Sequence, residues 1–171
     1  MKSQRGQALL ELAFQIPVML LLLFGGVQVG RIFYTYHTLQ KALRGGAGML
    51  ARSSNVAYCD PNEMLLADAR NFIVYGRLEG GGSPVVSGLT PDLIQIVPER
   101  QIVDSTSVTT CTCGGGSEPD PESCEPAPDG RPPDFVVVHL GSGFPLSVPV
   151  PFVNFPTINL RVSVRMPVTG G

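Results

Sequence analysis

The first third of the chain contains an apolar run that is long enough to cross a membrane. From Ile16 to Val27 every residue is apolar, glycine or proline. The wider segment Ala8–Val29 holds 22 residues, which as a helix span roughly 33 Å, against about 30 Å for the hydrocarbon core of a bilayer. Lys2 and Arg5 precede the run, and basic residues favour the cytoplasmic side. The pattern predicts one crossing at residues 7–30, with a cytoplasmic N-terminus.

The residues after this run continue as an amphipathic helix. Apolar side chains recur every three or four positions, which is the period of one helix face. These positions are Ile32, Tyr36, Leu39, Leu43, Ala47 and Leu50. The polar positions that fall largely off this stripe are Arg31, Thr35, Thr38, Lys41 and Arg52. We expect one helix from about Ala8 to about Arg52, roughly 65 Å long, whose half at 31–52 packs on the rest of the protein.

A second helix is predicted at 61–75. Asp60 is its expected N-cap, with Pro61 at the first helical position and Glu63 three residues after the cap, and Gly76 ends it. This is the arrangement of a capping box. The face expected to be mostly buried carries Met64, Leu65, Ala67, Ala69, Phe72 and Ile73.

Four β-branched or alternating segments predict strands between residues 92 and 168. They are DLIQIVP, QIVDSTSVTTCTC, DFVVVHL and TINLRVSVRMPV, the last with Leu160, Val162 and Val164 on one side. Successive strands after two helices predict an α+β fold, in which the long helix covers a small antiparallel sheet. The prolines between Pro145 and Pro156 predict an irregular crossover, because proline cannot donate to a ladder.

Composition and charge exclude several functions. The formal charge of -2 and the pI near 5.6 give no basic surface, so we expect no nucleic-acid partner. The chain has no phosphate-binding loop and no nucleophile elbow, and His37 and His139 are far apart in sequence. We therefore expect no catalytic residues and no cofactor. The acidic, proline- and glycine-rich segment 114–134 predicts an exposed loop; a variable tip that touches a partner is the alternative.

The cysteines predict disulfides outside the cytoplasm. All four lie beyond the apolar run, at Cys59, Cys111, Cys113 and Cys124, and an even number in an exported domain favours disulfides. Three pairings are possible. Cys111 and Cys113 lie on the same side of a predicted strand and are awkward partners for each other, so we expect Cys59 to pair with one and Cys124 with the other. Zinc is the alternative, but C-x-C without a nearby histidine does not match a zinc site, and no metal is expected.

Glu11 is the unusual residue, because it lies within the apolar run. A charge at the centre of a bilayer costs about 2.5 to 3.5 kcal/mol, which makes such an acid a candidate for function. The simpler alternative is a surface acid that reaches the interface. If the chain is cut after Gly6, the new amine of Gln7 lies one helical turn from Glu11, and the acid of one subunit can neutralise the amine of a neighbour within lipid.

Two other features of the run concern helix shape and packing. Pro17 removes one backbone hydrogen bond, so a kink or local loosening is expected there. Gly26 and Gly30 form a G-x-x-x-G pair, which permits close approach of another helix. Together with Glu11, this pair favours lateral packing of the helix in an assembly.

These features resemble a known kind of N-terminus. A short basic leader ending in glycine, MKSQRG, then a glutamate at the fifth position of the mature chain and a long apolar helix resemble type IV pilins. The longer run RGQALLELAFQIPVMLLLLFGGVQVGRIFYTYHTLQKALRGGAGMLAR is similar to the TadE-like minor pilin, or pseudopilin, family of tight-adherence (Tad, type IVc) pilus systems. The matching positions are the RG and the following aliphatic-Glu segment, Pro17 before the leucine run, the trailing LQKALRGGA, and Gly26, Gly30, Arg31, Phe33 and Tyr34.

The resemblance implies a type IV pilin-like fold and cleavage by a prepilin peptidase between Gly6 and Gln7. It also implies that Glu11 is used in processing or in subunit docking. Gln7 and Leu12 stand where the family commonly has an aromatic or hydrophobic residue, and an N-terminal glutamine can cyclise, which would remove the amine that Glu11 pairs with.

The predicted organisation is a leader at 1–6, a transmembrane helix half at 7–30 and an extracytoplasmic α+β head at 31–171. The predicted protein is a minor pilin or pseudopilin of the bacterial cytoplasmic membrane, with its head periplasmic or extracellular. Its expected partners are major and minor pilin subunits, the prepilin peptidase, the inner-membrane assembly platform and membrane lipid. The alternative is an uncleaved, signal-anchored periplasmic binding or scaffold protein of a secretion machine; a hydrolase released by ordinary signal peptidase is more remote. The cleavage position separates these functions.

Overall fold

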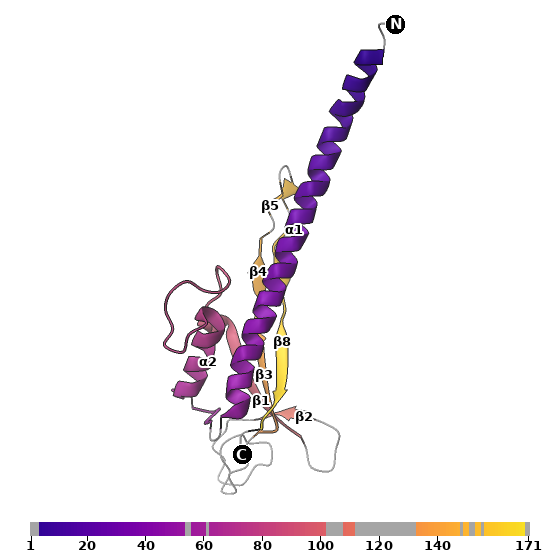
Figure 1. The fold of residues 1–171 in the computed structure, drawn as a ribbon. Helices are drawn as coiled ribbons and strands as arrows, with labels where there is room; N and C mark the ends of the chain where they lie inside the picture. Colours follow the sequence, from indigo (N-terminus) through magenta and orange to yellow (C-terminus); the bar gives the residue numbers. More distant parts are fainter. Residues whose placement is uncertain are drawn as a thin grey trace.

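The N-terminal part of the molecule is a single long helix that extends beyond the rest of the protein (Figure 1). In this computed structural model, α1 runs from Gln4 to Arg52 and continues through Pro17. Its 49 residues correspond to about 74 Å at 1.5 Å per residue. The structure describes residues 4–53, 56–60, 62–101, 108–111, 133–147, 149–150, 153–154 and 156–169. The predicted continuous helix is confirmed, and it begins at Gln4 instead of Ala8.

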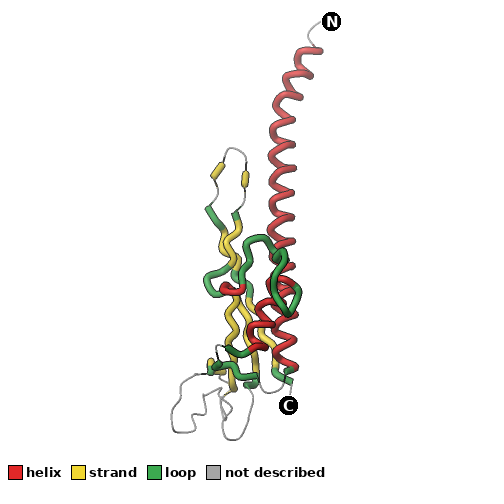
Figure 2. Tube along the Cα trace, turned by 90° about the vertical axis from the view of Figure 1, so that its left-hand side faces the viewer, coloured by secondary structure: helices red, strands yellow, loops and turns green. Residues whose placement is uncertain are grey.

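The C-terminal half of α1 packs against a small α+β head (Figure 2). The predicted stripe is buried at Leu39, Leu43, Ala47 and Leu50. The stripe is wrong at one turn, because Thr35 is 7% exposed and Tyr36 is 36% exposed. Successive residues differ by about 100° around a helix, so Thr35, one turn before Leu39, faces the head while Tyr36 is turned away from it.

The second helix, α2, runs from Met64 to Tyr75 and ends at Gly76, which adopts the left-handed conformation with φ of 69°. The predicted N-cap at Asp60 is wrong. The Asp60 carboxylate accepts the backbone N–H of Asn62 at 2.8 Å, and Glu63 caps the helix by accepting from the N–H of Leu65 at 3.3 Å. An aspartate that bonds its own backbone two residues on forms a turn that competes with helix, so the helix begins later.

The buried face of α2 differs in part from the predicted one. Its buried residues are Leu66, Ala69, Ile73 and Val74. Ala69 and Ile73 were predicted, whereas Met64 is 74% exposed and Ala67 is also exposed. Met64 and Ala67 lie on the side of α2 that faces away from the core, so their side chains are in solvent, whereas Leu66 in the same turn is buried.

Four strands form one antiparallel sheet in the order β2-β1-β3-β8. They are β1 Ile94–Gln101, β2 Val108–Thr110, β3 Phe135–Leu140 and β8 Ser163–Pro167, and a short 3-10 helix, η1 Pro91–Leu93, precedes β1. β1 and β3 pair from Ile94 opposite Leu140 to Glu99 opposite Phe135. The predicted antiparallel sheet is confirmed.

One face of this sheet carries the core. Val136, Val138 and Leu140 of β3 are buried, and α1 contacts both β3 and β8, so the helix covers the sheet as predicted. The opposite face carries a polar cross-strand cluster. There Nε of Arg165 lies 2.8 Å from a carboxylate oxygen of Glu99, and its guanidinium lies 4.0 Å from the ring centroid of Phe135.

The proline-rich segment after β3 is not the irregular crossover that was predicted. It forms two small antiparallel ladders, β4 Phe144–Leu146 with β7 Ile158–Leu160, and β5 Pro149–Val150 with β6 Val153–Asn154. In a two-stranded ladder each strand keeps one edge free, so a proline whose nitrogen faces that edge removes no ladder bond. The segment TINLRVSVRMPV, predicted as one strand, forms two strands, β7 and β8. We call strands β4 to β7 the proline-rich ribbon.

Most of the predicted exposed loop 114–134 lies outside the described residues. At its end, Pro133 is buried, and the Asp134 carboxylate accepts the backbone N–H of Gln101 at 2.8 Å. These two positions are therefore tied to the sheet and are not part of an exposed loop.

Candidate functional site

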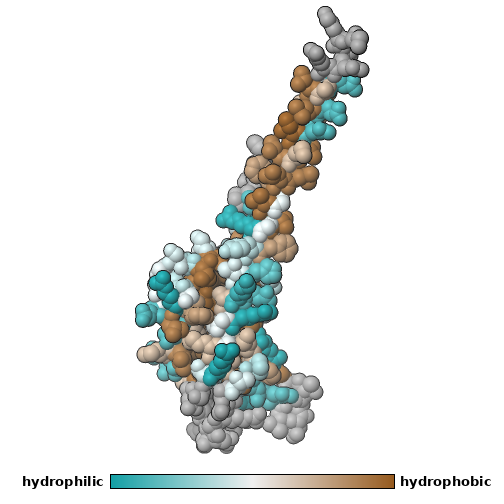
Figure 3. Space-filling model, viewed as in Figure 1, coloured by the Kyte–Doolittle hydropathy of each residue, from teal (hydrophilic) through white to brown (hydrophobic). Residues whose placement is uncertain are grey.

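The exposed half of α1 is the most unusual surface of the molecule. Every side chain from residue 6 to residue 27 is exposed, and among the described residues α1 is the one helix long and apolar enough to cross a membrane. Figure 3 shows this apolar surface along the upper part of the helix. Large exposed side chains include Phe14 at 72%, Leu22 at 73% and Leu23 at 60%. Soluble monomers rarely expose contiguous apolar patches above a few hundred Å², so this surface is built for lipid or for other helices.

Glu11 lies within this surface, on α1 and one turn after Gln7. Its side chain is exposed, and no basic side chain in the part of the chain that the structure describes pairs with it. A carboxylate that no described side chain neutralises on an apolar helix surface is available to a cation from another molecule. Gly6 and Gln7 are also exposed and helical, so the predicted cleavage junction is part of α1.

Gly26 and Gly30 also face open space. A Cβ atom added at either glycine would have no heavy atom within 4 Å. Among the residues that the structure describes, therefore, nothing packs against the G-x-x-x-G pair. Its predicted role in packing against another helix is compatible with this exposure and stays a prediction.

A different glycine pair makes the close helix contact inside the chain, and sequence reasoning did not single it out. At Gly45 an added Cβ would lie 2.8 Å from Cε1 of Phe72, and at Gly46 it would collide with the side chain of Ile73 and lie 3.3 Å from the carbonyl oxygen of Ala69. These glycines let α1 and α2 approach closely. The sequence signal for this contact is a pair of adjacent glycines inside a predicted helix, because each glycine lowers helix stability by about 1 kcal/mol relative to alanine.

Two of the four cysteines, Cys59 and Cys111, are in the part of the chain that the structure describes. Cys59 follows α1 in a turn and Cys111 follows β2, and both are disulfide-bonded. Cys113 and Cys124 are outside the described residues, so the predicted pairing stays a prediction.

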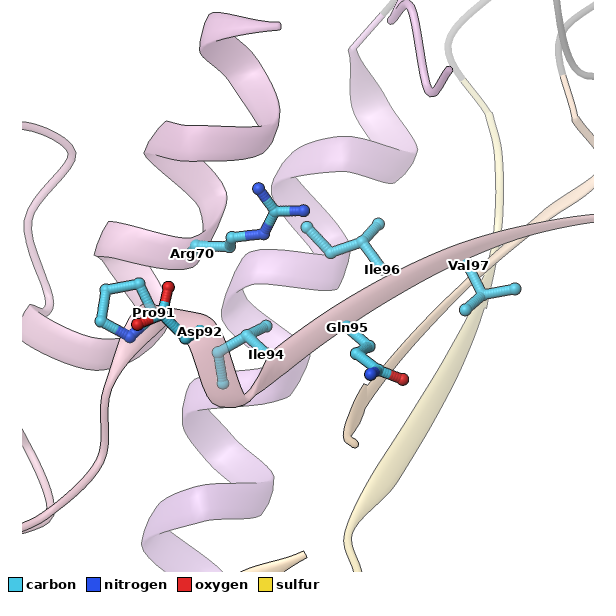
Figure 4. Close-up of a pocket in the computed structure, with 7 residues that line it drawn as sticks. All are labelled: Arg70, Pro91, Asp92, Ile94, Gln95, Ile96 and Val97. Atoms are coloured by element: carbon cyan, nitrogen blue, oxygen red, sulfur yellow. The ribbon is translucent and has the colours of Figure 1, made fainter. Parts of the chain in front are cut away.

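The head has two hollows of note. One, of about 460 Å³, lies beside β1 and is lined by Arg70, Pro91, Asp92, Ile94, Gln95, Ile96 and Val97. In Figure 4 the Arg70 guanidinium points toward Ile96, and the Asp92 carboxylate lies beside Pro91. The other, of about 720 Å³, lies between α1, α2 and β8, where Met49, Phe72 and Met166 contribute apolar surface. Neither lining contains a histidine, cysteine or serine that could act as a nucleophile or general base.

The two histidines lie on different elements and do not form one site. His37 lies on α1, where its ring meets that of Tyr36 edge to face at 5.9 Å between centroids, and His139 lies on β3. Within the described ranges, no group of three metal-binding side chains is close enough to hold an ion.

The fold and this surface define the class: a pilin-like α+β protein whose one long apolar helix fits a single-pass membrane anchor. A match to a protein family gives a more specific result than the fold. Residues 6–47 match the family model for TadE-like proteins, which confirms the sequence resemblance over this N-terminal region. No curated protein and no solved structure gave a significant match.

The family match also bears on function. It indicates a protein associated with a Tad pilus, and it suggests contact with other pilus components. The TadE-like family is a pilin-type structural family and not a family of enzymes.

Proposed function

We propose that this protein is a minor pilin or pseudopilin that takes part in assembly of a Tad-type pilus or secretion apparatus. The observation that carries the proposal is the complete exposure of residues 6–27 on a helix whose other half is built into the head core. The head needs only the second half of α1 for its own packing. The first half is thus free to exchange lipid contacts for contacts with the helices of other pilin subunits.

The proposed steps before assembly begin at the N-terminus. Residues 1–6 are a leader that a prepilin peptidase removes, so that Gln7 carries the new amine. Residues 7–30 cross the cytoplasmic membrane with the N-terminus inside, and residues 31–171 form the head outside. The disulfides of the head join Cys59 to one of Cys111 and Cys113, and Cys124 to the other.

Glu11 sets the register of assembly in this mechanism. When a subunit leaves the membrane platform, its Glu11 pairs with the Gln7 amine of a neighbour, and Gly26 and Gly30 let the two helices approach. An unpaired charge in lipid or in a helix bundle is costly, so the pair favours the one axial position in which both charges are neutralised.

The test compares two acids that are both exposed in the structure. We expect Glu11→Ala to abolish incorporation of the subunit into pili, whereas Glu79→Ala, in the head, leaves incorporation unchanged. Both variants are expected to reach the membrane at normal levels with a protease-resistant head. Normal incorporation of Glu11→Ala would refute the role of the carboxylate, and a membrane-resident protein that never enters pili would favour the signal-anchored scaffold.

A further inference from the structure

The proline-rich ribbon extends from the head toward the exposed half of α1. In Figures 1 and 2 its strands run alongside α1, and the end formed by β5 and β6 reaches the level of the apolar half of the helix. α1 contacts β5. The first shielded side chain on α1 is that of Gln28, which is half-buried, although the predicted membrane segment ends only at residue 30. The end of the ribbon and the membrane segment therefore overlap along α1.

The ribbon has the composition of a membrane contact. Residues 141–160 contain no Asp, Glu, Lys or Arg, although at the 15% charged content of the whole chain a segment of 20 residues would carry about three. Four of its residues are prolines: Pro145, Pro149, Pro151 and Pro156. An unsatisfied backbone donor is costly in an apolar phase, and proline has no N–H to satisfy. A short ribbon rich in proline is therefore suited to the membrane interface.

We propose that the end of the ribbon formed by β5 and β6 rests in the interfacial region of the bilayer that α1 crosses. The occupant is lipid, because any bilayer that surrounds residues 7–30 must also meet a ribbon end that lies at the same level. The head is then held at the membrane at two places, which fixes its rotation about α1 before assembly. The inference rests on the proposed membrane insertion of α1.

Tryptophan fluorescence tests this placement, because the chain contains no tryptophan and each introduced residue reports alone. Full-length protein is reconstituted in vesicles of phosphatidylethanolamine and phosphatidylglycerol, some with lipid brominated near the headgroup end of the acyl chain. The reporter is Val150→Trp in β5, with Val153→Trp in β6 as a second reporter in case the first disturbs the fold. Phe14→Trp on α1 marks the membrane segment, and Met64→Trp on α2, at an exposed position, marks water.

We expect brominated lipid to remove most of the emission of Phe14→Trp and of both ribbon reporters and to leave Met64→Trp unchanged. If Phe14→Trp is quenched and both ribbon reporters behave like Met64→Trp, the ribbon inference is wrong while the membrane anchor stands. If Phe14→Trp is not quenched, the anchor and the proposed function fail with it. Ribbon emission that is shielded from water only at high protein density, and is unaffected by bromine, would place the ribbon against a neighbouring subunit and overturn the lipid contact.

Discussion

Replacement of Gly46 by alanine tests the close packing of α1 on α2. The added Cβ would collide with Ile73 and lie 3.3 Å from the carbonyl oxygen of Ala69. Ile73 is 0% exposed, so it cannot move aside without displacing other core side chains. Overpacking a well-packed core costs typically about 1 to 3 kcal/mol. Against this, alanine is about 1 kcal/mol better than glycine in a helix, so the two effects oppose each other.

Gly48→Ala separates the two effects, because it makes the same change in the same helix. There the added Cβ would lie 3.7 Å from Sδ of Met166, which is ordinary contact. We expect Gly48→Ala to stabilise the head by up to about 1 kcal/mol and Gly46→Ala to be about 1 to 3 kcal/mol less stable than Gly48→Ala. The difference between the two variants cancels the helix preference and leaves the packing cost.

The assay is unfolding of the full-length protein by urea in a mild detergent, followed by brief proteolysis to measure the folded fraction. Both variants keep the disulfides and the apolar helix half, so the comparison reports the head alone. Equal stability of the two variants, or a more stable Gly46→Ala, would show that α1 and α2 do not cross as closely as described.

Two further predictions concern other parts of the chain. Gly26→Leu is expected to leave the urea stability of the head unchanged, because among the described residues nothing outside the helix backbone lies within 4 Å of an added Cβ. It is also expected to reduce the yield of assembled pili; a destabilised head or a normal pilus yield would contradict this. Burial raises the pKa of Tyr58 from 10.0 to about 12, so the folded state holds this proton more tightly and stability should fall as pH rises from about 10 to about 12. The Tyr58 hydroxyl is buried without a hydrogen-bond partner in the described structure. Tyr58→Phe should therefore remove this fall in stability without loss of stability at pH 7. If the urea stability of Tyr58→Phe still falls between pH 10 and pH 12, another group causes the fall.

The long helix and the main sheet could be predicted because their patterns are long and regular. A largely apolar segment of 22 residues, Ala8–Val29, and a stripe from Leu39 to Leu50 leave little room for another structure, and β3 is centred on a run of three valines. The errors lie where one local interaction decides. The Asp60 carboxylate accepts the backbone N–H of Asn62, and α2 begins later than predicted. Thr35 takes the buried position one turn before Leu39, in place of Tyr36.

The proline-rich ribbon could not be predicted by the rule applied to it. Proline excludes a strand only where its nitrogen must donate, and that depends on whether a neighbouring strand exists on that side. Pairing of Pro145 opposite Asn159 is a tertiary fact that no local pattern contains. The roles of the glycines also depend on tertiary structure. Gly45 and Gly46 contact α2, whereas Gly26 and Gly30 are exposed. The sequence alone does not distinguish the two pairs, because it does not show where α2 lies.

The measurement that tests the central claim most directly is the intact mass and N-terminal sequence of the protein isolated from its native membrane. We predict a chain that begins at Gln7 and retains the apolar helix, since assembly through α1 requires removal of the leader and keeps residues 7–30. The same spectrum shows whether Gln7 has cyclised with loss of ammonia. A chain that begins at Met1 would contradict processing as a prepilin and favour a fixed anchor, and a chain that begins beyond Gly25 would mean that the apolar run is a signal peptide.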